Sequence, residues 1–383
     1  MYKRTIEKII DEYVKGEDHK TFYIWGPRRS GKTTILREFS EKLGVRVFNF
    51  DFTSDQRIFQ PERDVLDKLT KENKVILIDE VQNYPQATVV LKLLYDEYKT
   101  KVIATGSSEL RQKDKEFDTQ SGRFTEHYCL PLSVQEIRQN TDIPSYEEPN
   151  FERRLLEQLQ IFGAYPEVYA ANNLSDTEKS QLLENIVQTY ILKDVIDLYG
   201  LKNKKLAEDI LTKIALQLGS EVSVRELASS LGSNGVTVEN YIEIFIKNYI
   251  LFPLPSFKTN ARRVVSENRK LYFYDLGIRN ALVKDFRETN LRPDKGGVFE
   301  NVILIEFEKQ RKNTGALRNF YFYREYGGKE VDLVIEDYYK NYHTVEMKVQ
   351  TKGNVKDIFP HEHTFSAIDQ INYFREIQKI ISA

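Results

Sequence analysis

The feature that most constrains this chain is the octapeptide GPRRSGKT at residues 26–33, which fits the pattern G-x-x-x-x-G-K-S/T. The aromatic and β-branched run TFYIW precedes it, and apolar residues at helical spacing follow it: Ile35, Leu36, Phe39 and Leu43. Strand, glycine-rich turn and helix form the setting in which such a loop binds phosphate. The glycines let backbone N–H groups surround phosphate oxygens, and the helix N-terminus adds partial positive charge. We therefore predict a nucleoside-triphosphate site; the alternative is an ordinary glycine turn before a helix.

Within this loop, Lys32 is predicted to reach the β- and γ-phosphates, and the Thr33 hydroxyl to ligate Mg²⁺. Arg28 and Arg29 fill variable positions and receive no individual role. The expected nucleotide-binding residues are Gly26, Pro27, Arg28, Arg29, Ser30, Gly31, Lys32, Thr33 and Thr34. No Asn/Thr-Lys-x-Asp element follows the loop, so guanine specificity has no visible basis. ATP and Mg²⁺ are therefore the expected cofactors.

Two later segments carry polar groups at the ends of apolar runs. VILIDE at 75–80 ends in Asp79, expected in the magnesium shell, and Glu80, expected to polarise the attacking water. A solvated strand end is the alternative for this pair. The run KVIATGSS ends in Ser107 and Ser108, one of which is expected to sense the γ-phosphate; a plain Ser/Thr turn is the alternative.

Composition limits the other classes of function. The net charge of −2 gives no global basic field for nucleic acid. Cys129 is the single cysteine, which excludes an intramolecular disulfide and fits a reducing, cytoplasmic setting. No apolar run approaches the ~18 residues of a membrane span, so no membrane partner is expected. The charged N-terminus has helical periodicity and does not read as a signal peptide.

The chain resembles bacterial and archaeal AAA-type ATPases that carry a C-terminal domain of uncharacterised role. The resemblance rests on the loop, VILIDEVQ, ATGSS, SGRF and LPLS within 121–133, FGAYPEV at 162–168, YDLGIRNAL and VFENVILIE. FGAYPEV has Phe162 where a glycine is common in the family. The resemblance implies an α/β fold, with a parallel sheet that has the loop's strand near its middle, and a homo-oligomeric ATPase. It also implies that Arg123 reaches the γ-phosphate of a neighbouring subunit; local surface pairing is the alternative.

The middle of the chain is predicted to be helical. The segment 140–150, with two prolines, reads as a loop. VSVRELASSLG and VTVENYIEIFIKNYIL, separated by the turn SNG, predict a helix-turn-helix followed by a hairpin. Cations gather in the loop of that hairpin, residues 258–270: Lys258, Arg262, Arg263, Arg269 and Lys270. A winged helix that contacts DNA phosphates is one interpretation, and a solvated basic loop is the other.

The C-terminal segment predicts a second candidate site. Glu300 lies on an expected helix, Asp332 on a strand, and Glu346 with Lys348 forms an E-x-K on the next strand. This ordered set is similar to the PD-(D/E)XK nuclease core. The resemblance implies that the three carboxylates hold Mg²⁺ and that Lys348 is the catalytic lysine. A fold retained only for binding is the alternative. His361 and His363 could share a metal, but a solvated helix start is the preferred interpretation.

These observations predict four domains: an ATPase core (1–135), a helical lid or connector (136–200), a winged-helix-like domain (201–290) and a small α/β nuclease-like domain (291–383). Three functions remain open: an ATP-driven machine that acts on DNA and cleaves it, a DNA-binding ATPase with a silent nuclease core, and a regulatory nucleotide switch that binds a protein partner. We favour DNA association and leave cleavage open.

Overall fold

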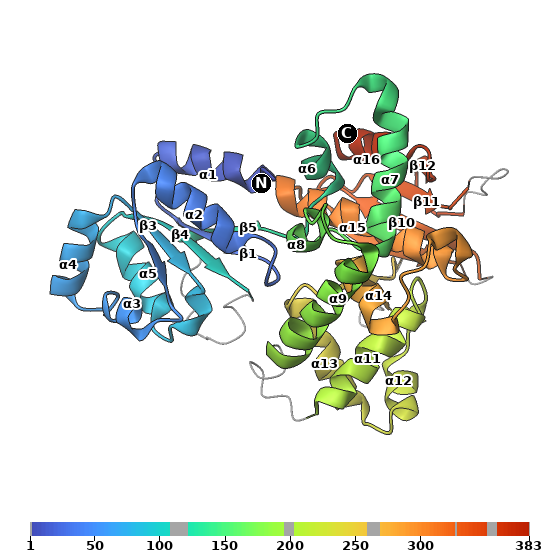
Figure 1. The fold of residues 1–383 in the computed structure, drawn as a ribbon, viewed down its shortest axis with the longest axis horizontal. Coiled ribbons are helices and arrows are strands. Elements are labelled where there is room, and N and C mark those ends of the chain that lie inside the picture. Colours follow the sequence, from blue (N-terminus) through green and yellow to red (C-terminus); the bar gives the residue numbers. More distant parts are fainter. Residues whose placement is uncertain are drawn as a thin grey trace. The chain divides into compact units, whose positions relative to one another are not determined.

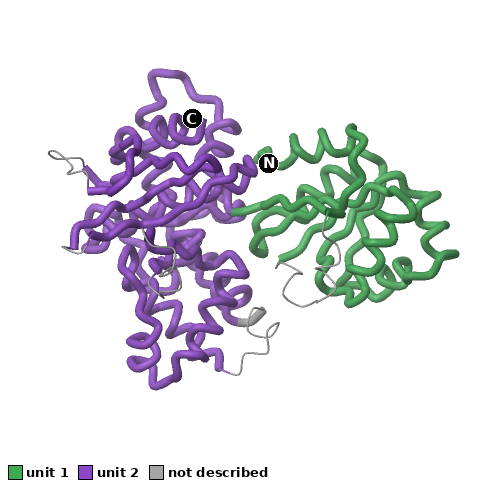
Figure 2. Tube along the Cα trace, turned by 180° about the vertical axis from the view of Figure 1, so that it is seen from behind, with its two compact units in different colours: residues 1–130 green, residues 131–383 purple. Residues whose placement is uncertain are grey.

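The computed structural model describes residues 2–107, 122–194, 203–258, 269–325, 328–350 and 358–382. Two compact units divide the chain, Met1–Leu130 and Pro131–Ala383 (Figure 2). Each unit is described by itself. The predicted domains after residue 135 all fall within the second unit, and their finer division stays a prediction.

The first unit is built on a five-stranded parallel sheet with the order β2-β3-β4-β1-β5 (Figure 1). Its strands are β1 (Thr21–Trp25), β2 (Val47–Asn49), β3 (Val75–Asp79), β4 (Lys101–Gly106) and β5 (Phe124–Tyr128). Every residue of β1 and β3 is buried, because both faces of a parallel sheet are covered. The predicted α/β class is confirmed, and β1 lies inside the sheet between β4 and β5.

In the described part of this unit, the α-helices that accompany the sheet are α1 (Thr5–Lys15), α2 (Lys32–Leu43), α3 (Thr53–Arg57), α4 (Arg63–Glu72) and α5 (Ala87–Asp96). Ile6 and Ile10 of α1 share one apolar core with Ile35 and Phe39 of α2 and with Phe22 of β1. The helical spacing read from the sequence is thus the spacing that faces the sheet. The core holds the start of α2, and with it the loop, firmly against the strand edge.

The second unit begins with helices. They are α6 (Val134–Gln139), α7 (Glu148–Ile161), α8 (Pro166–Tyr169), α9 (Asp176–Ile186), a π-helical stretch (Val187–Asp194), α11 (Lys204–Leu216), α12 (Val224–Ser230) and α13 (Gly235–Lys247). The predicted loop at 140–150 ends earlier than expected, at Glu148. Proline is tolerated in the first helical turn, where its missing N–H has no partner to lose, and so it did not prevent α7 from starting there.

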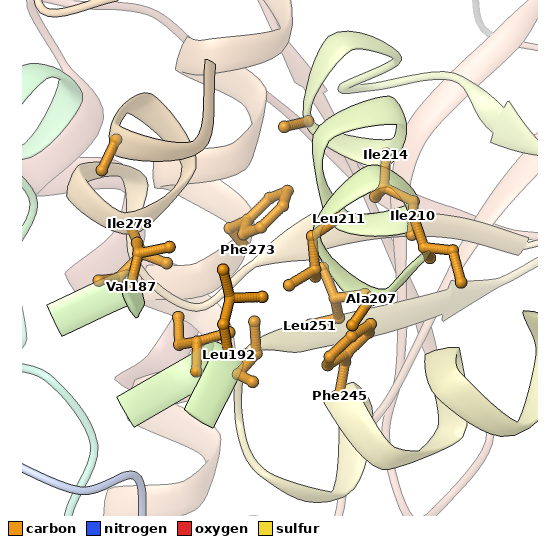
Figure 3. Close-up of a cluster of buried hydrophobic side chains, with 14 of the residues drawn as sticks. Val187, Leu192, Ala207, Ile210, Leu211, Ile214, Phe245, Leu251, Phe273 and Ile278 are labelled. Carbon is orange, nitrogen blue, oxygen red and sulfur yellow. The ribbon is translucent and has the colours of Figure 1, made fainter. Parts of the chain in front are cut away.

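A small antiparallel sheet follows α13, with the order β6-β8-β7. Its strands are β6 (Glu221–Val222), β7 (Leu251–Pro255) and β8 (Arg269–Phe273), and α14 (Leu276–Val283) comes after it. Figure 3 shows the apolar cluster that joins these elements: Leu211 of α11, Phe245 of α13, Leu251 of β7, Phe273 of β8 and Ile278 of α14 point toward one another. The predicted helix-helix-hairpin order is therefore one packed body.

The C-terminal part is a long helix with a four-stranded sheet. The helix α15 (Lys295–Thr314) packs against β8 and β11 (Figure 1). The sheet has the order β12-β11-β10-β9 and consists of β9 (Asn319–Arg324), β10 (Glu330–Glu336), β11 (Tyr342–Met347) and β12 (His363–Ile368), followed by α16 (Tyr373–Ser382). His363 opens strand β12, so the predicted helix start at 361–363 is wrong: the chain makes one more strand there before its last helix.

Candidate functional site

The phosphate-binding loop connects the carboxyl end of β1 to the first residue of α2. Gly31 caps the helix with φ 103°, a left-handed conformation that favours glycine, and Lys32 is the first helical residue. At Gly26, a Cβ atom would stand 2.0 Å from the carbonyl oxygen of Cys129. The loop therefore leaves the sheet with its backbone pressed against the end of β5, and only glycine fits at that point.

Lys32 is buried, and its ammonium group donates to the carbonyl oxygens of Gly26 and Pro27, both at 2.8 Å. Burial lowers the pKa of Lys32, and the nearby carboxylate of Glu80 opposes that shift. Ser30, fully buried, closes the loop by donating to the Pro27 carbonyl at 2.8 Å. The Lys32 ammonium group thus lies inside the loop, bonded to the loop's own carbonyl groups.

Asp79 ends β3 beside the loop. Its Oδ2 accepts a hydrogen bond from Thr33 Oγ1 at 2.8 Å, and its Oδ1 accepts from Thr105 Oγ1 and from the Glu80 amide. Parallel strands end at one edge of a sheet, so β1, β3 and β4 bring these groups together. The structure thus brings Thr33 and Asp79 of the two sequence motifs together, and their role toward magnesium stays a prediction. Thr105, on β4, was not predicted; its position two residues before Ser107 was the available signal.

Glu80 has φ 52°, a left-handed conformation that is uncommon outside glycine and that costs energy. Its carboxylate accepts a hydrogen bond from the Gln82 amide, which also donates to Ser107 Oγ at 3.2 Å. Gln82 therefore connects the predicted water-activating group to the predicted sensor hydroxyl. The side-chain oxygen of Gln82, Oε1, is buried without a hydrogen-bond partner among the described residues. Ser108, the other sensor candidate, lies outside the described residues.

Arg4 supports the loop from the N-terminus and was missed by sequence reasoning. Its guanidinium donates to the carbonyl oxygen of Ser30 at 2.7 Å, to Cys129 Sγ at 3.4 Å and to the carbonyl oxygen of Leu130. The side chain is only 8% exposed. A charged residue just ahead of an amphipathic helix reads as surface, so the sequence held no signal for this anchor.

Arg123 lies immediately before β5. Its Nε donates to Asp96 Oδ1 at 2.8 Å, and its carbonyl oxygen pairs with the amide of Thr21 at the start of β1. The loop follows the other end of β1. At about 3.3 Å per residue, the strand separates Arg123 from the loop of the same chain. The local pairing weighed from the sequence is present, and a role toward the γ-phosphate of a neighbouring copy stays a prediction.

The C-terminal candidate residues also meet. Glu300 of α15, together with Glu330 and Asp332 of β10, offers one carboxylate oxygen each, and these oxygens lie within 4.8 Å of one another. Glu330 was not in the predicted set. Burial raises the pKa of Glu300 and of Asp332, against the opposing charges of Lys270 and Lys348 respectively. The arrangement therefore concentrates carboxylates in a poorly solvated place.

Glu346 stands beside this trio rather than within it. Lys348 Nζ lies 2.7 Å from Glu346 Oε1 and 3.5 Å from Asp332 Oδ2. Asp332 Oδ2 also accepts the Met347 amide at 2.7 Å. Of the four residues predicted from the E-x-K pattern, the structure pairs Lys348 with both of its neighbouring carboxylates. Glu346 thus forms an ion pair with Lys348, and its role as a metal ligand stays a prediction.

Two members of the predicted basic loop have other places. Arg269 donates to Glu243 and Glu239 of α13, the former at 2.8 Å. Lys270 is 1% exposed, and its ammonium contacts Glu300 and Glu330. Both open strand β8, so neither is a free loop cation, which corrects that part of the prediction. The strand pairing began earlier than the turn-like sequence suggested, while residues 259–268 lie outside the described part of the chain.

Comparison with known families agrees with this geometry. The model of a family described as "AAA domain" matches residues 18–138. The first unit has the fold of an AAA-type P-loop ATPase. Two further models match the remainder: "Domain of unknown function (DUF8612)" at residues 153–290 and "Domain of unknown function (DUF4143)" at 295–370. Among the described residues, no helix combines the length and apolar character needed to cross a membrane.

Proteins similar to this chain include an uncharacterized protein of Haemophilus influenzae, 22% identical over 67% of this chain and 67% of that protein. Another is the uncharacterized protein MJ1544 of Methanocaldococcus jannaschii, 25% identical over 85% of this chain and 74% of that one. Solved structures include the Aeropyrum pernix ORC1 protein in complex with DNA, with 15% identity, TM-score 0.30 and coverage of 73% and 90%. The Thermotoga maritima RuvB Holliday junction branch migration motor has 17% identity, TM-score 0.29 and coverage of 64% and 86%.

Proposed function

We propose that this protein binds and hydrolyses ATP. The observation that carries the proposal is the 2.8 Å hydrogen bond between Thr33 Oγ1 and Asp79 Oδ2, which places the loop motif against the strand carboxylate. A hydroxyl and a carboxylate side by side are hard oxygen ligands of the kind that Mg²⁺ takes, so these residues fit that ion. Bound there, Mg²⁺ would neutralise charge on the β- and γ-phosphates.

The chain's own groups supply the remaining steps. Lys32 gives up its hydrogen bonds to the Gly26 and Pro27 carbonyls and donates instead to phosphate oxygens. Glu80 accepts a proton from the water that attacks the γ-phosphorus. Gln82 holds the Glu80 carboxylate, and so fixes the position of the base before substrate arrives. Ser107, bonded to the same amide, is placed to relay the presence of the terminal phosphate.

Phosphate release from Mg-ATP, with calorimetry of ATP binding, tests this function. Lys32→Ala is expected to abolish binding, because it removes the ammonium that pairs with the phosphates. Glu80→Gln is expected to keep binding and to lose about 10²–10⁴-fold in turnover. Glu72→Gln, at an exposed position on α4, is the matched control and should behave as the wild type. Turnover that persists in Lys32→Ala would reject the proposal.

We infer further that the active form is an oligomer in which Arg123 acts on a neighbour's nucleotide. The support is its place before β5, at the opposite end of the sheet from its own loop. Arg123→Ala and Lys32→Ala should each lack turnover, while their mixture should regain part of it. Mixed subunits would combine one intact loop with one intact arginine. A mixture as inactive as its components, in which mixed oligomers are shown to form, would contradict this role.

For the second unit we propose a winged-helix-like module that binds DNA. The support is the element order α11-β6-α12-α13-β7-β8 with a three-stranded antiparallel sheet. Arg262 and Arg263, which come between β7 and β8 in the sequence and lie outside the described residues, would contact phosphates. Binding should weaken steeply with salt and should be lost in the double reversal to Glu. Arg154→Glu, exposed on α7, is the control; equal affinity in both variants would reject the module's role.

A protein partner is the alternative, and one observation favours it. Arg269 forms ion pairs with Glu239 and Glu243 of α13, so its charge is already neutralised within the protein. Val236, at the start of the same helix, is 74% exposed. A helix whose acidic residues are paired with a cation and which exposes a valine suits protein contact better than phosphate contact. ATP hydrolysis stimulated by DNA would support the DNA-binding function, and indifference to both single- and double-stranded DNA would support the nucleotide switch.

For residues 291–383 we propose a nuclease-like fold. Its support is the order of helix, strand and strand that carries Glu300, Asp332 and Glu346, with Lys348 directly after the last of these strands. Mg²⁺- or Mn²⁺-dependent degradation of DNA tests whether it cleaves. Cleavage lost in both Asp332→Ala and Lys348→Ala would assign activity to this site. Cleavage retained in both would point to a contaminant.

A further inference from the structure

The carboxylate cluster already holds a cation that belongs to the protein. Lys270, on β8 of the three-stranded sheet, extends to Glu300 of α15 and Glu330 of β10. Its ammonium lies 3.1 Å from Glu300 Oε1 and contacts Glu330 Oε1, and it stands over the Phe322 ring at 5.5 Å. The Lys270 side chain is only 1% exposed, so water does not solvate its charge. It occupies the space between the carboxylates.

Each of these two carboxylates also accepts a hydrogen bond from a second side chain. Glu300 Oε1 accepts from the Tyr272 hydroxyl, and Glu330 Oε2 accepts from Arg324 Nε at 2.9 Å. Tyr272 and Lys270 lie on the same strand at alternate positions, so both point to the same side of β8. The partners of the cluster thus come from two different sheets and one helix, as in an ion-pair joint between packed elements.

Cations of the protein already pair with the carboxylates of this cluster. Lys348 pairs with Asp332 and Glu346, and Lys270 pairs with Glu300 and Glu330. Arg324 pairs with Glu330 and also with Glu221 of β6. Five carboxylates thus share three cations, whereas Mg²⁺ sites depend on uncompensated hard oxygens. The residues present therefore do not fit a divalent ion with Lys270 in place.

We propose that the Lys270 ammonium takes the position of the metal ion, so that the cluster is a permanent ion-pair joint and not a divalent-cation site. The joint fixes β8 to α15 and β10, and it makes the second unit one body. The nuclease-like fold then serves binding and not phosphodiester hydrolysis. The proposal concerns residues of the second unit alone, so its failure leaves the ATPase proposal untouched.

The test is to measure Mn²⁺ binding to the full chain in the absence of nucleotide. Binding is detected as a loss of the free Mn²⁺ signal in electron paramagnetic resonance. The wild type and Asp332→Asn should bind Mn²⁺ equally weakly. Lys270→Met, which keeps the length of the side chain and removes the charge, should bind at least about ten-fold more tightly. The added Asp332→Asn change should remove that gain. Lys270→Arg, which keeps the positive charge, is the matched control and should bind no better than the wild type.

Binding by the wild type that is lost in Asp332→Asn and kept in Thr33→Ala would overturn the proposal, because Thr33 belongs to the other site. This comparison does not require the Lys270 variants to fold, so it decides the matter alone. Where Lys270→Met folds, its melting temperature should rise with Mn²⁺ while that of the wild type stays constant. A Lys270→Met protein that folds and shows no gain in affinity would also overturn the proposal.

Discussion

Gly26→Ala is the substitution whose effect the structure defines most sharply. The added Cβ would stand 2.0 Å from the Cys129 carbonyl oxygen and 2.8 Å from its carbon. The Cys129 amide donates to the Trp25 carbonyl at 2.7 Å, so the two backbones are tied together at this point. Neither side is a flexible side chain, and the end of β1 must move relative to β5. Gly44→Ala is the matched control, because that site has φ +65° and no atom within 4 Å of the new Cβ.

The expected cost follows from comparing the two sites. Gly44→Ala should lose about 1–2 kcal/mol of unfolding free energy, the penalty for a left-handed alanine. Gly26→Ala adds overpacking, which costs about 1–3 kcal/mol where neighbours can shift. Because the neighbour here is backbone, we expect the upper end of that range, for a total of about 4–5 kcal/mol. The displaced loop should also lose ATP binding, while Gly44→Ala should keep it.

Urea unfolding followed by tryptophan fluorescence measures this difference. Trp25 is the single tryptophan, is fully buried in β1 and precedes Gly26, so its signal reports on the first unit. Calorimetry with Mg-ATP gives the binding. A Gly26→Ala protein within about 1 kcal/mol of Gly44→Ala, with ATP affinity intact, would refute the close backbone contact on which the loop geometry depends.

Three other variants test the surroundings of the loop. Arg4→Ala should lower the free energy of unfolding by about 2–3 kcal/mol, because buried carbonyl groups lose their donor, and should raise KM for ATP more than it lowers kcat. Lys3→Ala, at the adjacent exposed position, should do neither. Equal behaviour of the two variants in urea unfolding and steady-state kinetics would contradict the role of Arg4 in holding the loop. Thr105→Val should reduce ATP turnover, because Asp79 loses a donor, and Thr105→Ser should restore it; normal phosphate release by the Val variant would remove this role. Burial lowers the pKa of His127 to about 4. As the pH falls below about 6.5, the unfolded chain therefore takes up a proton at this histidine before the folded chain does. The contribution of His127 to the free energy of unfolding should be constant above pH ~6.5 and fall by up to about 3 kcal/mol toward pH 4. His127→Gln should flatten that part of the pH profile of the tryptophan-detected unfolding, and an unchanged slope would contradict it.

The predicted parts of the site share one property: their chemistry is encoded in adjacent residues. The glycines and Lys32 lie within one loop, and Asp79 and Glu80 end one apolar run, so strand ends alone bring them together. Gln82 lies in the short 3₁₀ turn after β3, and Thr105 lies near the end of β4. Their contacts depend on side-chain direction, which periodicity does not give. Arg4 reaches the loop from far along the chain, and no local pattern signals such a contact.

The second unit shows the same division. The helix, strand and strand that carry Glu300, Asp332 and Glu346 follow the predicted order, and Lys348 comes directly after the last of them. The structure adds Glu330 to the carboxylates of that site and places the Lys270 ammonium against two of them. Lys270 read as one member of a basic loop because charge clusters are usually solvated, yet strand pairing with β6 and β7 turns it inward. The burial of a charge depends on what packs over it, and here the covering elements come from distant parts of the chain.

By itself, the sequence determined a phosphate-binding loop in a parallel α/β sheet, because hydrophobic periodicity and glycine geometry act over a few consecutive residues. Tertiary structure alone decided which charges remain free. Arg123 meets Asp96, and Lys270 meets Glu300 and Glu330, because elements separated in the chain pack side by side. Ion pairing depends on distance in space and on the water that packing removes, and neither quantity is written in the order of the residues.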